Sequence, residues 1–579
     1  MARLHPGGGR TPGWPRPRGR LGVRRADDLP RLIGASRVGL DISTSRHPIG
    51  APLRTARVET ETNLGRTPRS AAALSGLIAA VGALAVGELV AGLSTHLVSP
   101  VVSVGNEFID RVPRPVKDWA IAWFGTNDKV VLVGGIVVTA LLFGCALGVA
   151  ARSRTWLGIA GLGVFALVGA AAAYQEVDAA WFAGLPSLAA WAGGAAVLLW
   201  LLARAHLDVP AQHEDLAPAR APSATSRRTF VLGSIGALSA AAVIGSTGRW
   251  LQGRYSAAAS RLAVMLPAAS RPKLPVVDGV DLEVPGLSSW YTPNTDFYRI
   301  DTALLVPQVQ AEDWSLRIHG MVDRELELSF DELVSRELFE EDITLLCVSN
   351  EVGGSLVGNA RWLGVRLDEL LAEAGIQPDA DQIVGRSSDG FTTGFPVSTL
   401  DDGRAAMVAV AMNGEPLPLR HGFPARLVVP GLYGYLSATK WLTEIELTRF
   451  DQFDQYWVQR GWSAEGPIKV MSRIDTPKGL ARIAAGTVTV AGVAWAQNVG
   501  IGRVEVRIDE GEWIEATLAA EENTMTWRQW RHEWDATPGR HLITVRATGH
   551  AGLTQTEDRA LPFPDGATGW HEIVVNVEG

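Results

Sequence analysis

The residues best suited to chemistry lie in the C-terminal half of this 579-residue chain, and the first of them is an unpaired thiol. The sequence has two cysteines, Cys145 and Cys347. Cys145 lies in the apolar run LLFGCALGVA, where a small buried side chain is the better interpretation. Cys347 ends the strand-like run ITLLC and has no cysteine partner in its half of the chain. Alone, it is best explained as a buried inert thiol, but if this half is exported its thiol stays unpaired in an oxidising compartment.

Three clusters of polar residues accompany this thiol. The first is YTPNTDFYR at 291–299, the second is ITLLCVSN at 343–350, and the third is HGFPAR at 421–426, followed by a Pro-Gly pair and a Lys-Trp pair. Each cluster is a weak signal alone. Arg299 by itself is best read as a surface or ion-pair residue, and His421 as a structural histidine.

Together the clusters resemble the sulfite oxidase family of molybdenum enzymes. The most specific match is HGFPARLVVPGLYGYLSATKW at 421–441, which resembles the pterin-binding segment of that family. The segment ITLLCVSN resembles its cysteine segment, and RWLGVRLDELL at 361–371 supports the match. The resemblance covers about residues 285–579 and does not include the preceding half.

This resemblance implies a molybdenum–molybdopterin cofactor. Cys347 would be the metal ligand and a catalytic residue, since soft thiolate ligation suits such a metal. Arg299 would contact the cofactor and position the substrate. Arginine and lysine side chains suit a pterin phosphate. The cofactor-binding residues implied by similarity are Tyr298, Arg299, Cys347, Asp389, His421, Arg426, Thr439 and Lys440.

The sequence departs from the family at two positions. Sulfite-oxidising members carry an anion-binding arginine five residues after their cysteine, where this chain has Val352. The active-site tyrosine of the family aligns with Trp462. Losing a charge-assisted hydrogen bond to a buried anion costs about 1.5–3 kcal/mol. Arg460 is a candidate replacement. Sulfite is therefore only one candidate substrate.

Three hypotheses follow. The leading one is a molybdenum oxidoreductase that transfers an oxygen atom between water and a small substrate, with sulfite oxidation as one possibility. The second is a reductase of sulfoxides on exported proteins or small molecules. The third is a non-enzymatic membrane adhesion or assembly protein, against which the retained Cys347 argues.

The elements that must position these residues form an α+β domain at 290–450. Residues 314–322 alternate in strand fashion, with Leu316 and Ile318 on one face. A capping box at 329–332 opens a helix, and apolar spacing from Leu367 predicts another that Gly375 ends. Regular βα alternation is missing.

Residues 467–579 read as an immunoglobulin-like β-sandwich of the dimerisation type. Strand patterns cover 487–494, 504–508 and 543–547, and Asp-Glu-Gly at 509–511 is a hairpin signal. A homodimer through this domain is therefore possible.

The N-terminal half predicts a membrane region at 70–250 after a disordered cytoplasmic tail at 1–69. Five apolar stretches, at about 71–97, 130–151, 155–173, 185–203 and 230–247, are long enough to cross a bilayer. Glu88 interrupts the first stretch, and we favour a packing role for it. Residues 251–289 read as a linker.

A twin-arginine-like motif, SRRTF at 226–230, precedes the fifth stretch. Lysine and arginine placement predicts a cytoplasmic N-terminus and an extracytoplasmic C-terminal half, although the loop at 98–129 carries basic residues that disagree. The predicted location is the bacterial cell membrane, multi-pass. A twin-arginine route also suits a protein that folds around its cofactor before export.

Bulk properties limit the partners. The net charge of -8 gives no basic field for nucleic acid. His96 and His206 lie at opposite ends of the spans, so no haem is predicted in this chain. Without a fused haem domain, electrons would pass to a separate carrier, a cytochrome or a quinone-linked protein.

Overall fold

The computed structural model describes residues 67–124, 127–176, 179–205 and 224–579. The expected tail, His206 and most of the segment before the SRRTF motif lie outside these residues. The motif itself falls in the first two turns of a long helix, and its role as an export signal stays a prediction.

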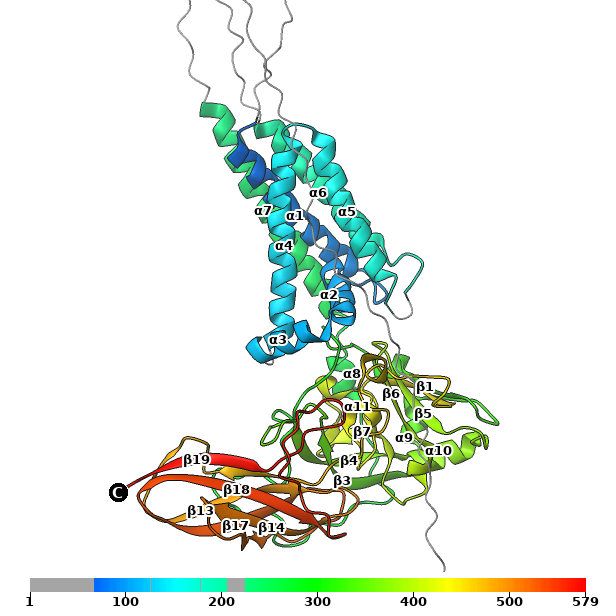
Figure 1. Cartoon of the computed structure of the whole chain (residues 1–579). Coiled ribbons are helices and arrows are strands. Elements are labelled where there is room, and N and C mark those ends of the chain that lie inside the picture. Colours follow the sequence, from blue (N-terminus) through cyan, green and yellow to red (C-terminus); the bar gives the residue numbers. More distant parts are fainter. Residues whose placement is uncertain (1–66, 125–126, 177–178, 206–223) are drawn as a thin grey trace, which may run out of the picture. The chain divides into compact units, whose positions relative to one another are not determined.

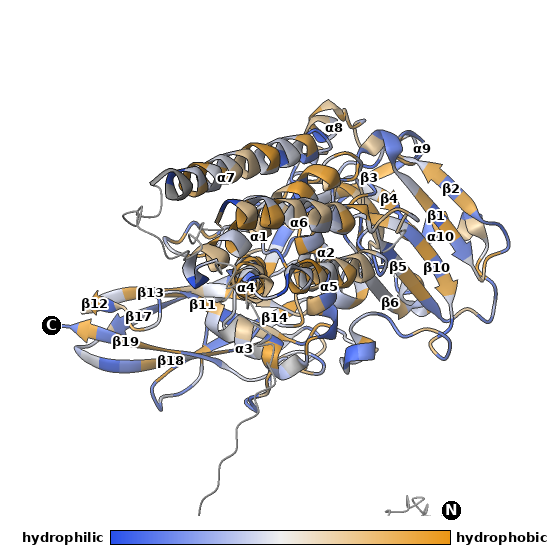
Figure 2. Ribbon diagram, turned by 90° about the horizontal axis from the view of Figure 1, so that it is seen from above, coloured by the Kyte–Doolittle hydropathy of each residue, from blue (hydrophilic) through white to orange (hydrophobic). Residues whose placement is uncertain are grey.

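The N-terminal half folds into helices (Figure 1). They are α1 Arg69–Ala91, α2 Pro100–Arg111, α3 Arg114–Phe124, α4 Asp128–Ala151, α5 Thr155–Ala173, α6 Leu185–Ala205 and α7 Ala224–Gly253. Among the described residues, five helices are long and apolar enough to cross a membrane: α1, α4, α5, α6 and a helical stretch that begins at Arg228 in α7. Their apolar character is plain in Figure 2. They overlap the five stretches predicted from the sequence, although α1 ends at Ala91 and not at residue 97.

The segment 98–129 differs from the loop that we expected, because it holds α2 and α3. Ser99 caps α2 through its side chain, and Pro100 occupies the first turn, where a missing N–H costs nothing. Both helices are amphipathic and too short to span a bilayer.

Small residues bring α1 and α4 into close contact. A Cβ placed on Gly76 would lie 2.0 Å from the carbonyl oxygen of Gly144, and one on Gly148 would lie 2.1 Å from that of Ala72. Such small-residue contacts let helices in a bilayer approach each other backbone to backbone.

The region that follows is built on two sheets. The first has the order β2-β1-β10-β5-β6, in which β1 and β10 are parallel and the other neighbours antiparallel. The second has the order β3-β4-β7-β8, with β9 paired to β7. Their bounds are β1 Ser315–Gly320, β2 Leu326–Ser329, β3 Leu338–Leu346, β4 Val357–Arg366, β5 Gln382–Ser387, β6 Thr392–Pro396, β7 Met407–Met412, β8 Glu415–Pro416, β9 Arg426–Val428 and β10 Leu442–Thr448.

Short helices complete this α+β region. They are α8 Ala258–Ala263, α9 Phe330–Val334, α10 Leu367–Ala374 and α11 Gly434–Ser437. The expected capping box opens α9, and Gly375 ends α10 with a φ of 74°. Leu316 and Ile318 are fully buried on one face of β1, as predicted.

The C-terminal residues form two further sheets around an apolar core. Their orders are β11-β13-β17-β16 and β12-β19-β18-β14-β15, and Val490, Val504, Trp530 and Val545 are among the buried residues between them. The strands are β11 Met471–Thr476, β12 Arg482–Ala484, β13 Gly486–Trp495, β14 Ile501–Ile508, β15 Ile514–Glu515, β16 Thr517–Leu518, β17 Arg528–Ala536, β18 Gly539–Gly549 and β19 His571–Glu578. The expected hairpin joins β14 to β15. The immunoglobulin type of this sandwich and its role in dimerisation stay predictions.

Candidate functional site

Cys347 lies immediately after β3, at the point where the strand leaves the second sheet. Its backbone N–H donates to the carbonyl oxygen of Leu356 (3.0 Å), and its own carbonyl accepts from Asn350 (3.0 Å). The residue is buried, and burial raises the pKa of its thiol, an effect that hydrogen bonds from Ser349 and the charge of Lys440 oppose. Without a metal the thiol is therefore neutral.

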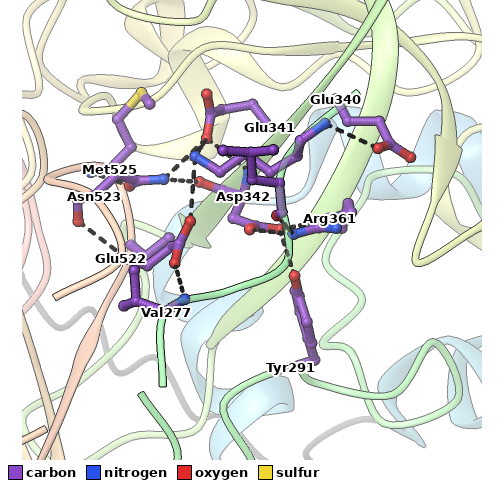
Figure 3. Close-up of polar contacts among 12 residues, drawn as sticks. Val277, Tyr291, Glu340, Glu341, Asp342, Arg361, Glu522, Asn523 and Met525 are labelled. Carbon is purple, nitrogen blue, oxygen red and sulfur yellow. Dashed lines mark hydrogen bonds and ion pairs between the residues drawn. The ribbon is translucent and has the colours of Figure 1, made fainter. Parts of the chain in front are cut away.

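A polar network fixes the strand that leads to this cysteine (Figure 3). The fully buried Asp342 accepts a bidentate pair of hydrogen bonds from Arg361 and one from the Tyr291 hydroxyl. Asn523, from the C-terminal region, donates to the Glu341 carboxylate and the Asp342 carbonyl. Because both β4 and the C-terminal region hold β3, the position of Cys347 is set by contacts from two parts of the chain.

The thiol lines a cavity of about 110 Å³. The segments that meet there are distant in sequence, namely 297–302, 347–349, 387–391, 426–441 and 457–462. Of the residues expected at the site, the cavity is lined by Tyr298, Cys347, Asp389, Arg426 and Lys440. The fold therefore brings all three sequence clusters to one place.

Arg426 is a buried cation whose charge the protein leaves unbalanced. It is 3% exposed, and its guanidinium donates only to backbone carbonyls, the nearest being that of His421 at 3.0 Å. Within the described part of the chain it forms no ion pair, and burial lowers its pKa to about 10. A buried charge without a counter-charge is costly, so this arrangement points to an anionic ligand.

Lys440 and Arg299 instead form ion pairs with the carboxylate of Asp301, a residue that was not predicted from the sequence. The Lys440 Nζ lies 2.9 Å from Asp301 Oδ2, and Arg299 makes a bidentate pair with the same carboxylate at 2.7 and 3.1 Å. Lys129, from the start of α4, adds a contact of 2.8 Å. These cations hold the pKa of Asp301 well below its usual range, whereas burial lowers the pKa of Lys440 to about 8. Asp301 lines the cavity and Arg299 does not.

His421 is fully buried next to these cations. Its Nε2 lies 3.0 Å from the carbonyl oxygen of Asn294, whereas Nδ1 is buried without a hydrogen-bond partner in the described structure. Burial and the charges of Arg426 and Lys440 lower its pKa to about 3. The imidazole is therefore neutral, with Nε2–H as donor and Nδ1 as an acceptor that no group in the described residues satisfies.

Of the remaining expected residues, Tyr298 and Asp389 line the cavity, and Thr439 is not among the lining residues. Tyr298 is buried, and its pKa is raised by burial and by the nearby Cys347. Asp389 lies in the turn between β5 and β6, accepts from the Phe391 N–H at 3.2 Å, and has a pKa raised by burial. Thr439 is fully buried, and its hydroxyl lies 2.8 Å from that of Thr393.

Aromatic rings form one wall of the cavity. Tyr435, Trp457 and Trp462 all line it, with centroids 5.9 Å apart for Tyr435 and Trp462 and 6.1 Å apart for the two tryptophans. Val352, at the position of the family's anion-binding arginine, packs in the same apolar cluster. The suggested replacement, Arg460, does not line the cavity; its guanidinium stacks on the Tyr456 ring at 3.5 Å.

The sequence offered partial signals for the missed residues. Asp301 stands two positions after Arg299, a spacing at which an arginine and a carboxylate can pair locally. Trp457 lies five residues before Trp462, the residue aligned with the tyrosine of the family. Phe391 follows the predicted Asp389 in a turn, and only the fold shows that its ring reaches the cavity.

Three kinds of comparison relate the chain to known proteins. Residues 303–457 match the oxidoreductase molybdopterin binding domain. An uncharacterized oxidoreductase, YuiH, of Bacillus subtilis is 35% identical over 155 residues, covering 26% of this chain and 74% of that protein. The mitochondrial sulfite oxidase of Drosophila melanogaster is 31% identical over 46% of this chain and 53% of its own length. The crystal structure of the sulfane dehydrogenase SoxCD from Paracoccus pantotrophus covers 53% of this chain at 23% identity, with a TM-score of 0.44.

The chain thus contains a molybdopterin-binding oxidoreductase domain. It belongs to the sulfite oxidase family of molybdopterin-dependent oxidoreductases, and it is an enzyme. This finding removes the non-enzymatic adhesion hypothesis. The chain spans about half the length of the curated sulfite oxidases that it matches.

The residues present fit the molybdenum–molybdopterin group. The unbalanced Arg426 suits an anion, the free Nδ1 of His421 suits a hydrogen-bond donor, and the Cys347 thiol suits the metal. In the described residues, no group of three or more His, Cys, Asp or Glu side chains could hold a metal ion. The site thus offers one protein thiol, that of Cys347, beside the cations Arg426 and Lys440.

Proposed function

We propose that this protein transfers an oxygen atom between water and a small, uncharged sulfur compound at a molybdenum–molybdopterin centre. The observation that carries the proposal is a buried thiol, Cys347, in one cavity with a buried and unbalanced Arg426. When bound, the cofactor supplies a metal that accepts or gives an oxygen atom together with two electrons.

The chain's own groups would have separate roles. Cys347 would bind the metal as a thiolate, since coordination to a metal deprotonates a thiol. Arg426 would neutralise the cofactor phosphate, and Lys440 would assist it from the same side of the cavity. His421, Tyr298, Asp389 and Thr439 would orient the pterin through hydrogen bonds. Arg299 would act on the substrate side by way of its pair with Asp301.

The wall of the cavity supports an uncharged substrate. Two tryptophans and a tyrosine line the same cavity as Cys347, and Val352, which is in the adjoining apolar cluster and not in the lining, provides no cation. Sulfur makes favourable contacts of about 0.3–1.5 kcal/mol with aromatic rings. Asp389 lines the same cavity and would repel a dianion if it were ionised. A sulfoxide, or the thioether formed from it, fits this wall better than sulfite does.

Sulfite oxidation is the second candidate, because several relatives carry the name sulfite oxidase. Both activities can be measured on full-length protein made in a host that synthesises the cofactor. We expect methionine sulfoxide to be reduced with a reduced viologen dye as donor. Turnover of sulfite with ferricyanide, without any turnover of sulfoxide, would make sulfite oxidation the first candidate and sulfoxide reduction the second. Turnover of neither substrate would refute the proposal.

The location and domain roles are proposed as follows. Five helices would anchor the chain in the membrane, residues 290–450 would carry the chemistry on the extracytoplasmic side, and residues 467–579 would mediate dimerisation. Five helices of sufficient length and the SRRTF motif support the anchor and the orientation. A C-terminal alkaline phosphatase fusion should be active, and activity only of a C-terminal fluorescent-protein fusion would contradict the orientation.

A further inference from the structure

A second cavity lies inside the helical region, away from the site described above. It has a volume of about 550 Å³ and is lined by residues of α1, α2, α4, α5 and α6. Its walls are almost entirely apolar, with side chains such as Leu84, Val104, Ile136, Leu147 and Leu162. Cavities that hold small organic molecules have this size and character.

Among the described residues of this apolar wall, one carries an ionisable group, the carboxylate of Glu88. The Ser99 hydroxyl donates to one of its oxygens, and the Gln252 amide donates to the other at 3.0 Å. A carboxylate inside a membrane span is costly, and such a group commonly marks a functional site. The sequence alone favoured a packing role, and the contacts with Ser99 and Gln252 agree with it; the place of Glu88 on the cavity wall allows a second use.

The depth of Glu88 follows from Gln252. Gln252 is one residue from the C-terminal end of α7, and α8 of the following region begins at Ala258. Glu88 therefore lies at the end of the bundle from which the chain enters its catalytic region, and the cavity extends from there along α4 as far as Leu147. At α2, Val104 lines the cavity, and the next residue, Gly105, lies against Leu304, three residues from the site residue Asp301.

The cavity opens on the outer surface of the bundle. The rings of Phe143 on α4 and Phe165 on α5 lie 4.9 Å apart at its edge, and they are 49% and 38% exposed. Val131 and Val168 also line it and are exposed. In a bilayer these side chains face lipid, so an apolar molecule can enter sideways.

We propose that this cavity binds a lipid-soluble quinone, with Glu88 next to a quinone oxygen. The apolar ring and tail of a quinone match the walls. A quinone carbonyl becomes a hydroxyl on reduction, so the carboxyl group of Glu88 can exchange a proton with it. A phospholipid chain would match the walls but would leave Glu88 without a role. The inference rests on the proposed function, which needs a partner for two electrons.

The chemistry balances in both directions. A sulfoxide with two electrons and two protons yields a thioether and water. A hydroquinone releases those two electrons and two protons and becomes a quinone, breaking two O–H bonds. Glu88 would accept one of these protons and water at this end of the bundle the other, which balances the two protons that the sulfoxide consumes. Oxidation of a sulfur substrate would run the same exchange in reverse.

Two neighbouring glycines provide a matched test. Gly135 lines the cavity, Gly134 does not, and at both positions an added Cβ meets nothing within 4 Å. Full-length protein in lipid nanodiscs would be photolabelled with an azido-quinone, and labelled peptides identified by mass spectrometry. We expect label on α1, α4 or α5, competed by decylubiquinone. Gly135→Leu should reduce labelling at least tenfold, and Gly134→Leu should not.

Equal labelling of the three proteins, or labelling that decylubiquinone does not reduce, would overturn the proposal and leave lipid as the occupant. Glu88→Gln should keep the label but slow electron exchange with decylubiquinone at least tenfold. Glu176→Gln, a carboxylate held by Asn106 outside the cavity, should change neither. Unchanged exchange in Glu88→Gln would overturn its role as proton acceptor. Labelling does not require turnover. If the proposed enzyme activity fails, the labelling result therefore still tests whether the cavity binds a quinone.

Discussion

Asp301 offers a sharp test of the electrostatics of the site, because one carboxylate balances three cations. Its side chain is 7% exposed and lies within 2.9 Å of Arg299, Lys440 and Lys129. Asp301→Asn keeps the size of the side chain and removes its charge. Arg299, Lys440 and Lys129 would then remain together without their counter-charge.

The size of the effect follows from burial. Removing one partner from a buried ion pair costs about 3–5 kcal/mol, because it leaves an uncompensated charge. In a domain of this size, each kcal/mol lowers the melting temperature by about 2–4 °C. The variant should therefore melt at least roughly 6 °C below the wild type at pH 7. Asp368→Asn is the control, since Asp368 pairs with Arg366 in the same Arg-x-Asp spacing but is 34% exposed. A surface pair contributes only about 0–1 kcal/mol.

The pH dependence of stability gives a second test of Asp301→Asn. The pKa of Asp301 is lowered in the folded protein, so its stabilisation is present above the unfolded pKa of about 3.9 and is lost as pH falls toward the folded value. The difference between wild type and Asp301→Asn should be full at pH 7 and shrink below about pH 4. Thermal unfolding in detergent, monitored by tryptophan fluorescence, measures the difference in melting temperature at pH 7 and its change with pH. Equal melting temperatures for Asp301→Asn and Asp368→Asn would refute the reasoning.

Three further predictions concern the cofactor, the substrate and pH. Arg426→Met should lower the molybdopterin content of purified protein about tenfold or more, since a charge-assisted bond of about 1.5–3 kcal/mol is lost; unchanged content by fluorescence of the oxidised pterin would contradict its role. Val352→Arg should raise kcat/KM for sulfite relative to methionine sulfoxide about tenfold or more; an unchanged ratio would show that this wall does not set the charge preference. His421 has a pKa lowered to about 3, so wild-type stability should fall as pH decreases below about 6.5, at up to about 1.4 kcal/mol per pH unit. His421→Asn should flatten this slope in acid unfolding curves, and an identical slope would mean that another group titrates.

The sequence alone predicted the elements with strong local signals. The apolar spans were long enough to be found by composition, and the capping box at 329–332 and Gly375 marked helix ends through local hydrogen bonding and backbone conformation. The segment at 421–441 predicted pterin-binding residues through its unusual spacing, and two of them, Arg426 and Lys440, line the cavity. These features depend on neighbours within a few residues, which a sequence displays directly.

The features that were missed depend on contacts between distant segments. Helices α2 and α3 were read as a loop, because their amphipathic pattern is short and lies between strong apolar spans. The pairing of Asp301 with Lys440 and Lys129 joins residues 139 and 172 positions apart. The role proposed for Glu88 depends on its contacts with Ser99, at the start of α2, and with Gln252 in α7. In each case the folded arrangement, and not the local pattern, decides the role of the side chain.

The most direct test of the central claim is the molybdenum content and metal-centre spectrum of wild-type protein beside Cys347→Ser and Cys145→Ser. These are the only cysteines in the sequence, so the second variant is a matched control. Elemental mass spectrometry should find about one molybdenum per wild-type chain, as expected for one thiolate-bound metal. The spectrum and activity should change in Cys347→Ser and remain unchanged in Cys145→Ser. Wild-type protein without molybdenum, from a host that makes the cofactor, would contradict the account.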